Sequence, residues 1–294
     1  GIMMVYWMLT FQRGQPAPDA IFEDGLPMLN IQTYVRAKSL EEAYTLNQKR
    51  NARVLGGMLW LKMASNTVGT AIDLCELGLD TIEEDETGFT LGAMATLRML
   101  EQHPGLAAYT QNAAAKAVQD IVGVQFRNMA TVGGSVWGRF GFSDVLTLLL
   151  AADARVNLYK AGTLPIETFA VMPYDRDLLV SVTVPKYRDA AFAYKAMRIQ
   201  RTDLPVLNCA LARLDGEYRL AVGARPGKAV LLRDENGLLA DGITPESAAA
   251  FAAYAAQNVP TGANARGSAE YRTHLVEVLT RRCALELEGD PLCR

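Results

Sequence analysis

The sequence predicts a mixed α+β protein with two domains. Predicted helices and strands follow one another in irregular blocks along the 294 residues, which is not the alternation of a parallel α/β sheet. No Gly-x-Gly-x-x-Gly follows a predicted strand, so a Rossmann fold is disfavoured. The length allows two domains of ordinary size, and the composition changes at Pro185–Asp189. We therefore expect one domain over 28–187 and a smaller one over 188–294.

The first domain begins with short elements that have clear caps and turns. Ser39 and Glu42 form a capping box that opens a helix ending near Arg50. Strands are predicted at 52–55 and 71–74, with a brief helical turn through Lys62 between them. A hairpin of 81–84 and 89–93 turns at Thr87-Gly88. Helices are predicted at 96–102, 106–120 and 144–152, with a loop over 125–143 before the last of these.

Strands dominate the second half of the chain. They are predicted at 154–160, 177–184, 192–199, 207–214 and 218–222, with a turn and short edge at 162–169. Asp215-Gly216 is a typical hairpin turn between the last two. Thr244-Pro245 opens a helix to Asn258, because proline is favoured at the first helical position. The final helix is predicted over 267–286.

Composition indicates a globular protein and excludes several functions. Half of the residues are hydrophobic, the formal net charge is −3, and no Lys/Arg-rich run suggests a nucleic-acid partner. The four cysteines, Cys75, Cys209, Cys283 and Cys293, show no Cys-x-x-Cys spacing. We therefore expect no metal site on this chain, and a reducing, cytoplasmic location. Only two histidines occur, outside the motifs, so we expect no catalytic acid/base residue here.

Residues 1–27 differ from the rest of the chain. The apolar run Ile2–Phe11 is shorter than the ~20 residues of a membrane-spanning helix, and no basic segment marks a secretory signal. Gln15–Asp19 has the composition of a linker. We expect an extension that is a tag remnant or is loosely ordered, with Met28 as the natural start. The alternative is an arm that docks on a partner.

Two glycine pairs follow predicted apolar segments. The first stands in Val54-Leu55-Gly56-Gly57, and the second in Thr131-Val132-Gly133-Gly134-Ser135. Glycine pairs let the backbone turn tightly and bring N–H groups close to a phosphate. Two such turns in one domain can hold the two phosphates of a dinucleotide, although each alone is more often a structural turn.

The stretch from Gln125 to Asp144 resembles the FAD-binding signature of the molybdenum hydroxylase flavoproteins, the family of xanthine dehydrogenase and carbon monoxide dehydrogenase. Its pattern is Q-[IV]-R-N-x-[AG]-[ST]-[IV]-G-G-N, followed by a Ser-Asp pair. The matching residues are Gln125, Arg127, Asn128, Ala130, Thr131, Val132, Gly133, Gly134, Ser143 and Asp144. Arg266–Arg272 also resembles the C-terminal R-G-S-x-x-Y-R motif of this family. The resemblance runs from about Tyr34 to the last helix.

This resemblance implies a two-part FAD-binding domain, a C-terminal flavoprotein domain and a set of FAD contacts. The implied cofactor-binding residues are Val54, Leu55, Gly56, Gly57, Met58, Leu59, Thr131, Gly133, Gly134, Ser135, Asp144, Leu179 and Lys195. Asp144 is placed within hydrogen-bonding reach of the cofactor, Leu179 against the flavin, and Lys195 near the isoalloxazine. Each also has an ordinary structural interpretation: a helix N-cap, a core leucine and a solvated lysine.

The resemblance also implies partners. A large subunit would hold the molybdopterin, a small subunit would hold two [2Fe–2S] clusters, and NAD⁺ or another acceptor would take the electrons. The first loop departs from the family, because Met58 and Leu59 replace the usual Ser/Thr and Asp/Glu. The alternatives are therefore a scaffold subunit that no longer holds FAD tightly, and a self-sufficient flavin oxidase. The missing acid/base residues disfavour the oxidase.

Overall fold

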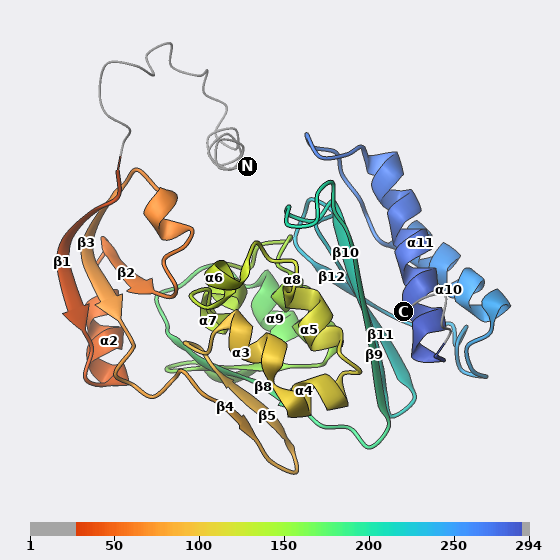
Figure 1. Ribbon diagram of the computed structural model, residues 1–294, viewed down its shortest axis with the longest axis horizontal. Helices are drawn as coiled ribbons and strands as arrows, with labels where there is room; N and C mark the ends of the chain where they lie inside the picture. The colour runs from red at the N-terminus through yellow and green to blue at the C-terminus, as the bar shows by residue number, and fades with distance from the viewer. Residues whose placement is uncertain (1–27, 290–294) are drawn as a thin grey trace.

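Three β-sheets lie in a row along the long axis of the molecule (Figure 1). The computed structural model describes residues 28–289. The prediction for residues 1–27 therefore lies outside the described part of the chain. Within it, the mixed α+β class is confirmed, and the small helices of the centre separate the middle sheet from the C-terminal one.

The first sheet is parallel and has the order β1–β3–β2. Its strands are β1 (Asn30–Arg36), β2 (Ala52–Leu55) and β3 (Thr67–Asp73). Helix α2 (Leu40–Asn47) begins as predicted: Ser39 Oγ accepts a hydrogen bond from the Glu42 N–H at 3.1 Å. The returning bond differs, because the Glu42 carboxylate accepts from the Lys38 N–H at 2.7 Å. Strand β2 runs directly into the first glycine pair, and the short helix η1 (Leu61–Met63) follows it.

The middle sheet has the order β4–β5–β8–β6–β7. These strands are β4 (Ile82–Glu84), β5 (Gly88–Gly92), β6 (Arg155–Leu158), β7 (Gly162–Pro165) and β8 (Leu179–Pro185). Its helices are α3 (Leu97–Gln102), α4 (Pro104–Tyr109), α5 (Ala113–Val118), α6 (Val124–Arg127), α7 (Val132–Trp137), α8 (Asp144–Ala151) and α9 (Ile166–Val171). Every residue of α8 is buried, because this apolar helix also packs against the C-terminal sheet.

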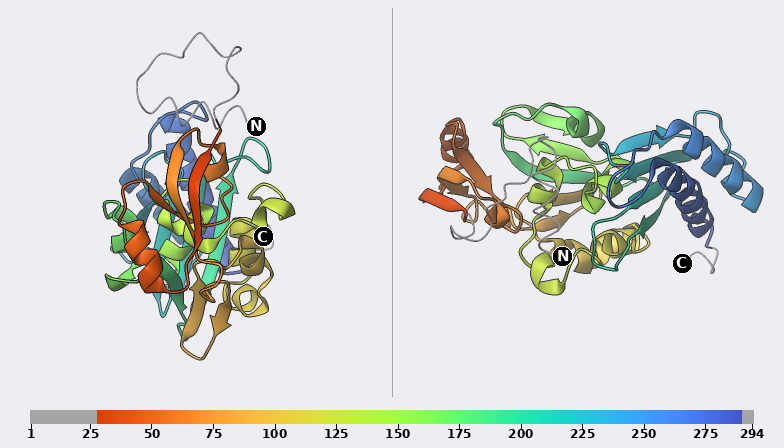
Figure 2. Two further views of the ribbon diagram at one scale, coloured as in Figure 1. Left: turned by 90° about the vertical axis from the view of Figure 1, so that its left-hand side faces the viewer. Right: turned by 90° about the horizontal axis from the view of Figure 1, so that it is seen from above.

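The C-terminal sheet is antiparallel, with the order β12–β11–β10–β9. It contains β9 (Ala190–Met197), β10 (Leu207–Leu214), β11 (Glu217–Gly223) and β12 (Val230–Arg233). Helices α10 (Pro245–Asn258) and α11 (Ala269–Leu287) cover its outer face, as the right-hand view of Figure 2 shows. Helices α5 and α8 pack against strands of the same sheet, and the alternating residues of β9 divide between two apolar cores.

The C-terminal motif Arg266–Arg272 has a structural role. Ser268 caps α11, and Arg272 is fully buried. Its guanidinium donates to the carbonyls of Val206, Gly262 and Gly267 at 2.6–2.9 Å. Burial lowers the pKa of Arg272, so these carbonyl contacts are needed to stabilise its charge. The motif therefore ties α11 to the loops at one end of the sheet.

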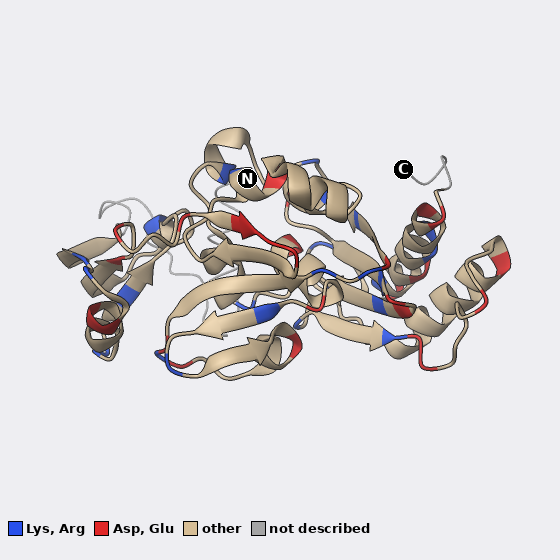
Figure 3. Ribbon diagram, turned by 90° about the horizontal axis from the view of Figure 1, so that it is seen from below, with Lys and Arg blue, Asp and Glu red and all other residues tan. Residues whose placement is uncertain are grey.

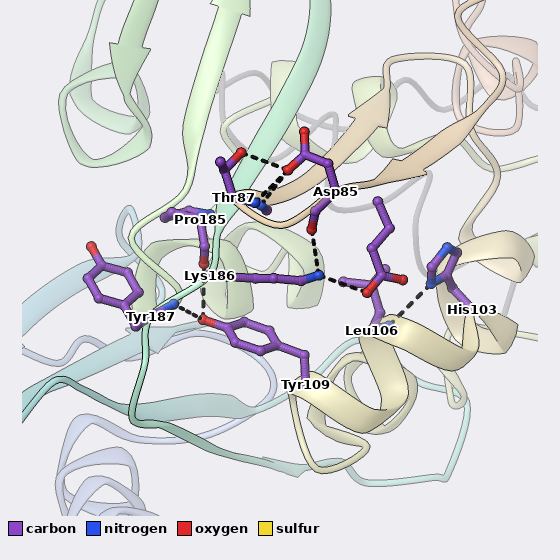
Figure 4. Close-up of polar contacts among 10 residues, drawn as sticks. Asp85, Thr87, His103, Leu106, Tyr109, Pro185, Lys186 and Tyr187 are labelled. Carbon is purple, nitrogen blue, oxygen red and sulfur yellow. Dashed lines mark hydrogen bonds and ion pairs between the residues drawn. The ribbon is translucent and has the colours of Figure 1, made fainter.

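The peptide between the middle and C-terminal sheets is held by one tyrosine (Figure 4). The Tyr109 hydroxyl donates to the Pro185 carbonyl at 3.0 Å and accepts from the Tyr187 N–H at 2.9 Å. Lys186 Nζ bonds to Glu84 Oε1 at 2.8 Å and lies over the Phe89 ring. The segment where the composition changes is thus attached to both α4 and the β4–β5 hairpin. The boundary at 187/188 stays a prediction.

Several predicted elements differ from the structure. The helix predicted over 106–120 is two helices, because Gln111 and Asn112 have φ angles of +48° and +65°. The predicted loop 125–143 contains α6 and α7. Strands β1 and β12 and helix α9 were not predicted. Strand β1 was missed because its outward residues are polar and only Ile31 and Val35 are partly buried.

Acidic and basic residues are interspersed along the ribbon (Figure 3). No helix among residues 28–289 is long and apolar enough to cross a membrane.

Candidate functional site

The two glycine turns, far apart in sequence, lie against one another. A Cβ on Gly56 would lie 2.8 Å from Thr131 Oγ1 and 3.7 Å from the Gly134 Cα. A Cβ on Gly57 would collide with the Met129 carbonyl oxygen. Gly56 and Gly57 therefore let the first loop pack directly on the second. The structure thus brings the two predicted phosphate turns into one place.

The second glycine pair does not offer bare N–H groups, contrary to the sequence-based expectation. Gly133 and Gly134 belong to the short helix α7, which Thr131 caps. The Gly134 N–H donates to Thr131 Oγ1 at 3.1 Å, and the Gly133 N–H donates to the Ala93 carbonyl at 2.8 Å. Gly133 is buried against Ala93, whereas Gly134 is exposed. Gly133 and Gly134 therefore matter because they are small enough for close packing, and they do not supply free N–H donors.

The first loop supplies the donors instead. None of the hydrogen bonds of the described residues uses the N–H groups of Gly56, Gly57, Met58 or Leu59. Met58 has a φ angle of +60°, the left-handed conformation that can direct successive N–H groups toward one anion. Val54 and Leu55 fix the start of this loop, because they pair with Ile72 and Asp73 of β3. Four unpaired donors in a loop that lies next to the exposed Gly134 fit a phosphate group.

Asp144 is not the cap of its helix. Ser143 caps α8, and its hydroxyl also donates to the Ser135 carbonyl at 2.9 Å, which links α7 to α8. The buried Asp144 carboxylate pairs with Arg198 at 2.9 Å and accepts from Asn208 Nδ2 at 3.0 Å and from the Tyr194 hydroxyl. Burial, and then the charge of Asp144, hold the pKa of Tyr194 well above its ordinary value. The phenol therefore remains a hydrogen-bond donor.

Arg198, Tyr194 and Asn208 were missed by sequence reasoning. Asn208 is a fully buried amide in the largely apolar strand β10, and Thr147 Oγ1 donates to its Oδ1 at 3.1 Å. A polar residue within an apolar strand was the available signal, because buried polar groups need partners. Its partner on α8 lies 64 residues away in sequence, so the pairing itself was not visible.

Lys195 lies beside the Asp144 cluster rather than at the glycine turns. Its ammonium pairs with Glu286 of α11, which also pairs with Lys116 of α5. Lys195 lines a cavity of about 410 Å³. The other residues around this cavity are Lys116, Gln119, Asp120, Tyr194, Ala196, Met197, Arg198 and Arg201. Arg198 connects the two features, because it lines the cavity and binds Asp144.

Leu179 is a core residue at the start of β8 and pairs with Leu158. Its neighbour Val180 accepts a hydrogen bond from the Ala93 N–H at 2.9 Å, and Ala93 in turn contacts Gly133. Leu179 therefore shares an apolar core with Ala93 and with Val132 of the second turn. Arg127 of the signature is also structural: it binds both carboxylate oxygens of Glu101, at 2.8 and 3.2 Å.

Comparison with known proteins identifies the family. Residues 28–187 match the family described as the FAD binding domain in molybdopterin dehydrogenase. Residues 192–287 match the CO dehydrogenase flavoprotein C-terminal domain. YgfM of Escherichia coli K12 is 28% identical over 254 residues, which cover 85% of this chain and 93% of YgfM. The nicotine 6-hydroxylase medium subunit of Paenarthrobacter nicotinovorans is 27% identical, over 86% of this chain and 96% of that subunit.

The fold is also found in a solved structure. A chain of the carbon monoxide dehydrogenase from Hydrogenophaga pseudoflava superimposes with a TM-score of 0.77 at 24% identity. The match covers 87% of this chain and 96% of that one. The chain therefore belongs to the FAD-binding family of the molybdopterin dehydrogenases, the flavoprotein subunits of FAD-dependent oxidoreductases of the xanthine dehydrogenase and carbon monoxide dehydrogenase type.

Proposed function

We propose that this chain binds FAD and carries electrons within a multi-subunit molybdenum hydroxylase. The observation that carries the proposal is the contact between the two glycine turns, with unpaired N–H groups from Gly56 to Leu59 beside the exposed Gly134. These donors bind the pyrophosphate, and the small Gly134 leaves room for it. Thr131 and Ser135 hold α7 in place, because each uses its hydroxyl within that helix.

The isoalloxazine lies toward the cavity that Lys195 lines, with Asp144 fixing its wall. Asp144 holds Arg198 at this wall through the ion pair and holds Tyr194 through the phenol. Lys195 and Lys116 share one carboxylate, Glu286, so this wall keeps a positive charge that favours a reduced, negatively charged flavin. When bound, FAD supplies the exchange between single electrons and electron pairs. Glu286 orients Lys195, because it holds the ammonium between α11 and β9.

The proposed partners rest on the family, because a relative such as the nicotine 6-hydroxylase protein is named a medium subunit. Within residues 28–289 no group of three His, Cys, Asp or Glu side chains is placed to hold a metal ion. We infer that a small subunit with [2Fe–2S] clusters delivers the electrons and that a large molybdopterin subunit oxidises the substrate. NAD⁺ or another acceptor removes the electrons, and the complex works in the cytoplasm.

Co-expression tests this proposal. The chain is produced alone and together with a molybdopterin subunit and a [2Fe–2S] subunit, and each preparation is assayed with purines, aldehydes and carbon monoxide. The isolated chain is expected to oxidise none of them, while slow dye reduction by NADH is expected. The complex is expected to be stable on gel filtration. Turnover of such a substrate by the isolated chain contradicts the proposal.

A scaffold subunit without FAD is the second candidate. It is favoured by the apolar Met58 and Leu59 of the first loop and by the use of the Gly133 and Gly134 N–H groups inside the protein. The visible spectrum separates the two candidates. Flavin absorption in the purified chain supports the first, and a colourless chain that takes up no FAD supports the scaffold.

A further inference from the structure

Four aromatic rings gather around the two glycine turns. Trp60 follows the first turn directly, Phe126 precedes the second, and Phe142 and Phe140 follow α7. The Trp60 ring lies 6.3 Å from that of Phe126 and 6.4 Å from that of Phe142. Phe140 stacks on Phe142 at 5.2 Å, with 9° between the ring planes. We call Trp60, Phe126, Phe140 and Phe142 the aromatic cluster.

The cluster is partly exposed, although its rings would gain from burial. Trp60 is 41% exposed and Phe140 is 46% exposed. Large aromatic side chains left in solvent beside a binding loop mark a surface that a ligand covers. The backbone accommodates the arrangement, because a Cβ on Gly138 would lie 2.5 Å from the Phe140 ring. Gly138 therefore lets Phe140 fold back onto the end of α7.

We propose that the aromatic cluster binds the adenine ring of FAD, with Trp60 as the stacking residue. This inference rests on the proposed FAD function. Trp60 lies two residues after Met58 in the loop with the unpaired N–H groups, so a base joined to that phosphate by one ribose reaches it. Stacking of a base on an aromatic side chain requires only the π-face of the base, so uncharged rings such as that of Trp60 are sufficient.

The charges distinguish the two ends of the cofactor. Lys116 and Lys195 line the cavity beside the Asp144 cluster and share one carboxylate, Glu286. The positive charge that remains suits the isoalloxazine, which becomes negative on reduction, whereas the adenine keeps its charge. The cluster presents apolar rings, which suit the adenine. Trp60 thus compensates for the polar side chains that Met58 and Leu59 do not supply.

Calorimetric titration of the full chain, stripped of cofactor, tests this assignment with FAD, ADP and FMN. Trp60→Ala is expected to raise the dissociation constants of FAD and ADP by about tenfold and to leave that of FMN unchanged. Trp60→Phe is expected to keep most of the affinity. Tyr271→Ala is the matched control, because Tyr271 is 42% exposed on α11, away from the cluster. Phe140→Ala is a second variant, and it is expected to weaken the binding of ADP as well.

The outcomes are distinct. FAD and ADP affinities that do not change in Trp60→Ala, while the parent chain binds FAD, overturn this inference and leave the proposed function intact. If Trp60→Ala binds FMN more weakly and ADP with unchanged affinity, the flavin rather than the adenine lies on the aromatic cluster, and the inference is overturned. A parent chain that binds neither FAD nor ADP overturns the proposed function together with this inference. Thermal unfolding of each variant shows whether the fold is kept.

Discussion

Gly56 and Thr131, 75 residues apart in the chain, are so close that a Cβ on Gly56 would lie 2.8 Å from Thr131 Oγ1. Thr131 is also the cap of α7, so the same hydroxyl that organises the second turn faces the backbone of the first. This contact therefore determines the spacing between the two loops, and a larger side chain at either turn changes it.

Gly134→Val is expected to abolish FAD binding and keep the fold. Gly134 is exposed, and a Cβ there would meet only the Thr131 hydroxyl, at 3.2 Å. The valine side chain then occupies the space assigned to the pyrophosphate. Equilibrium dialysis against FAD and circular dichroism measure the two properties. Ala250→Val, at an exposed position of α10, is the control for placing a β-branched residue in a helix. Full FAD occupancy in a folded Gly134→Val would show that the loop is wrongly assigned.

Gly57→Ala is expected to destabilise the protein, and Gly134→Ala is not. The added methyl at Gly57 collides with the Met129 carbonyl, which is backbone and cannot move aside easily. Overpacking of this kind costs roughly 1–3 kcal/mol. Alanine at Gly134, inside a helix, is neutral or stabilises by up to about 1 kcal/mol. Urea unfolding measures both. Equal stabilities for the two variants would contradict the packing of the loops.

Asp144→Ala is expected to cost about 3–5 kcal/mol of folding free energy, because it leaves the buried Arg198 charge without a carboxylate. The Asp144→Leu/Arg198→Met double variant removes both charges and is expected to recover part of the loss. A double-mutant cycle with chemical denaturation measures the coupling. If the single and double variants lose the same free energy, the ion pair does not organise this cluster.

Glu101→Gln is expected to destabilise the protein at neutral pH and much less in acid. Burial raises the pKa of Glu101, but hydrogen bonds from Arg127 and Arg98 outweigh it and hold the pKa below its ordinary value. A carboxyl with a depressed pKa stabilises the fold above its unfolded value of about 4.3, and this contribution is lost as the pH falls through the lower, folded value. Denaturation at pH 7 and pH 3 measures the difference. If Glu101→Gln loses the same free energy of unfolding at pH 7 and at pH 3, the charge of Glu101 contributes nothing through Arg127 and Arg98.

Local signals were sufficient for much of the fold. The Ser39 cap, the Asp215-Gly216 turn and the Thr244-Pro245 helix start are interactions between residues close in sequence, and the structure contains all three. Strand β1 was missed because its polar residues carry no apolar alternation, and it forms only by pairing with β3. The break between α4 and α5 depends on left-handed residues that propensity does not reveal.

The candidate site was also predictable only in part from the sequence. Glycine pairs indicate tight turns, but which N–H groups stay free depends on tertiary partners such as Ala93, which engages Gly133. The position of Lys195 beside Glu286 and the burial of Asp144 by Arg198 also arise from strands packing on α8 and α11. The aromatic cluster combines three segments, so its rings were visible in the sequence only as separate residues.

The most direct test is the identity and amount of cofactor in the purified chain. The protein is expressed in a flavin-replete host, its visible spectrum is recorded, and the cofactor released by heat is separated by chromatography. We expect flavin absorption and about one FAD per chain, because the N–H groups from Gly56 to Leu59, unpaired among residues 28–289, offer more donors than the single phosphate of FMN needs. A chain that holds only FMN, or that stays colourless after incubation with excess FAD, would contradict the account.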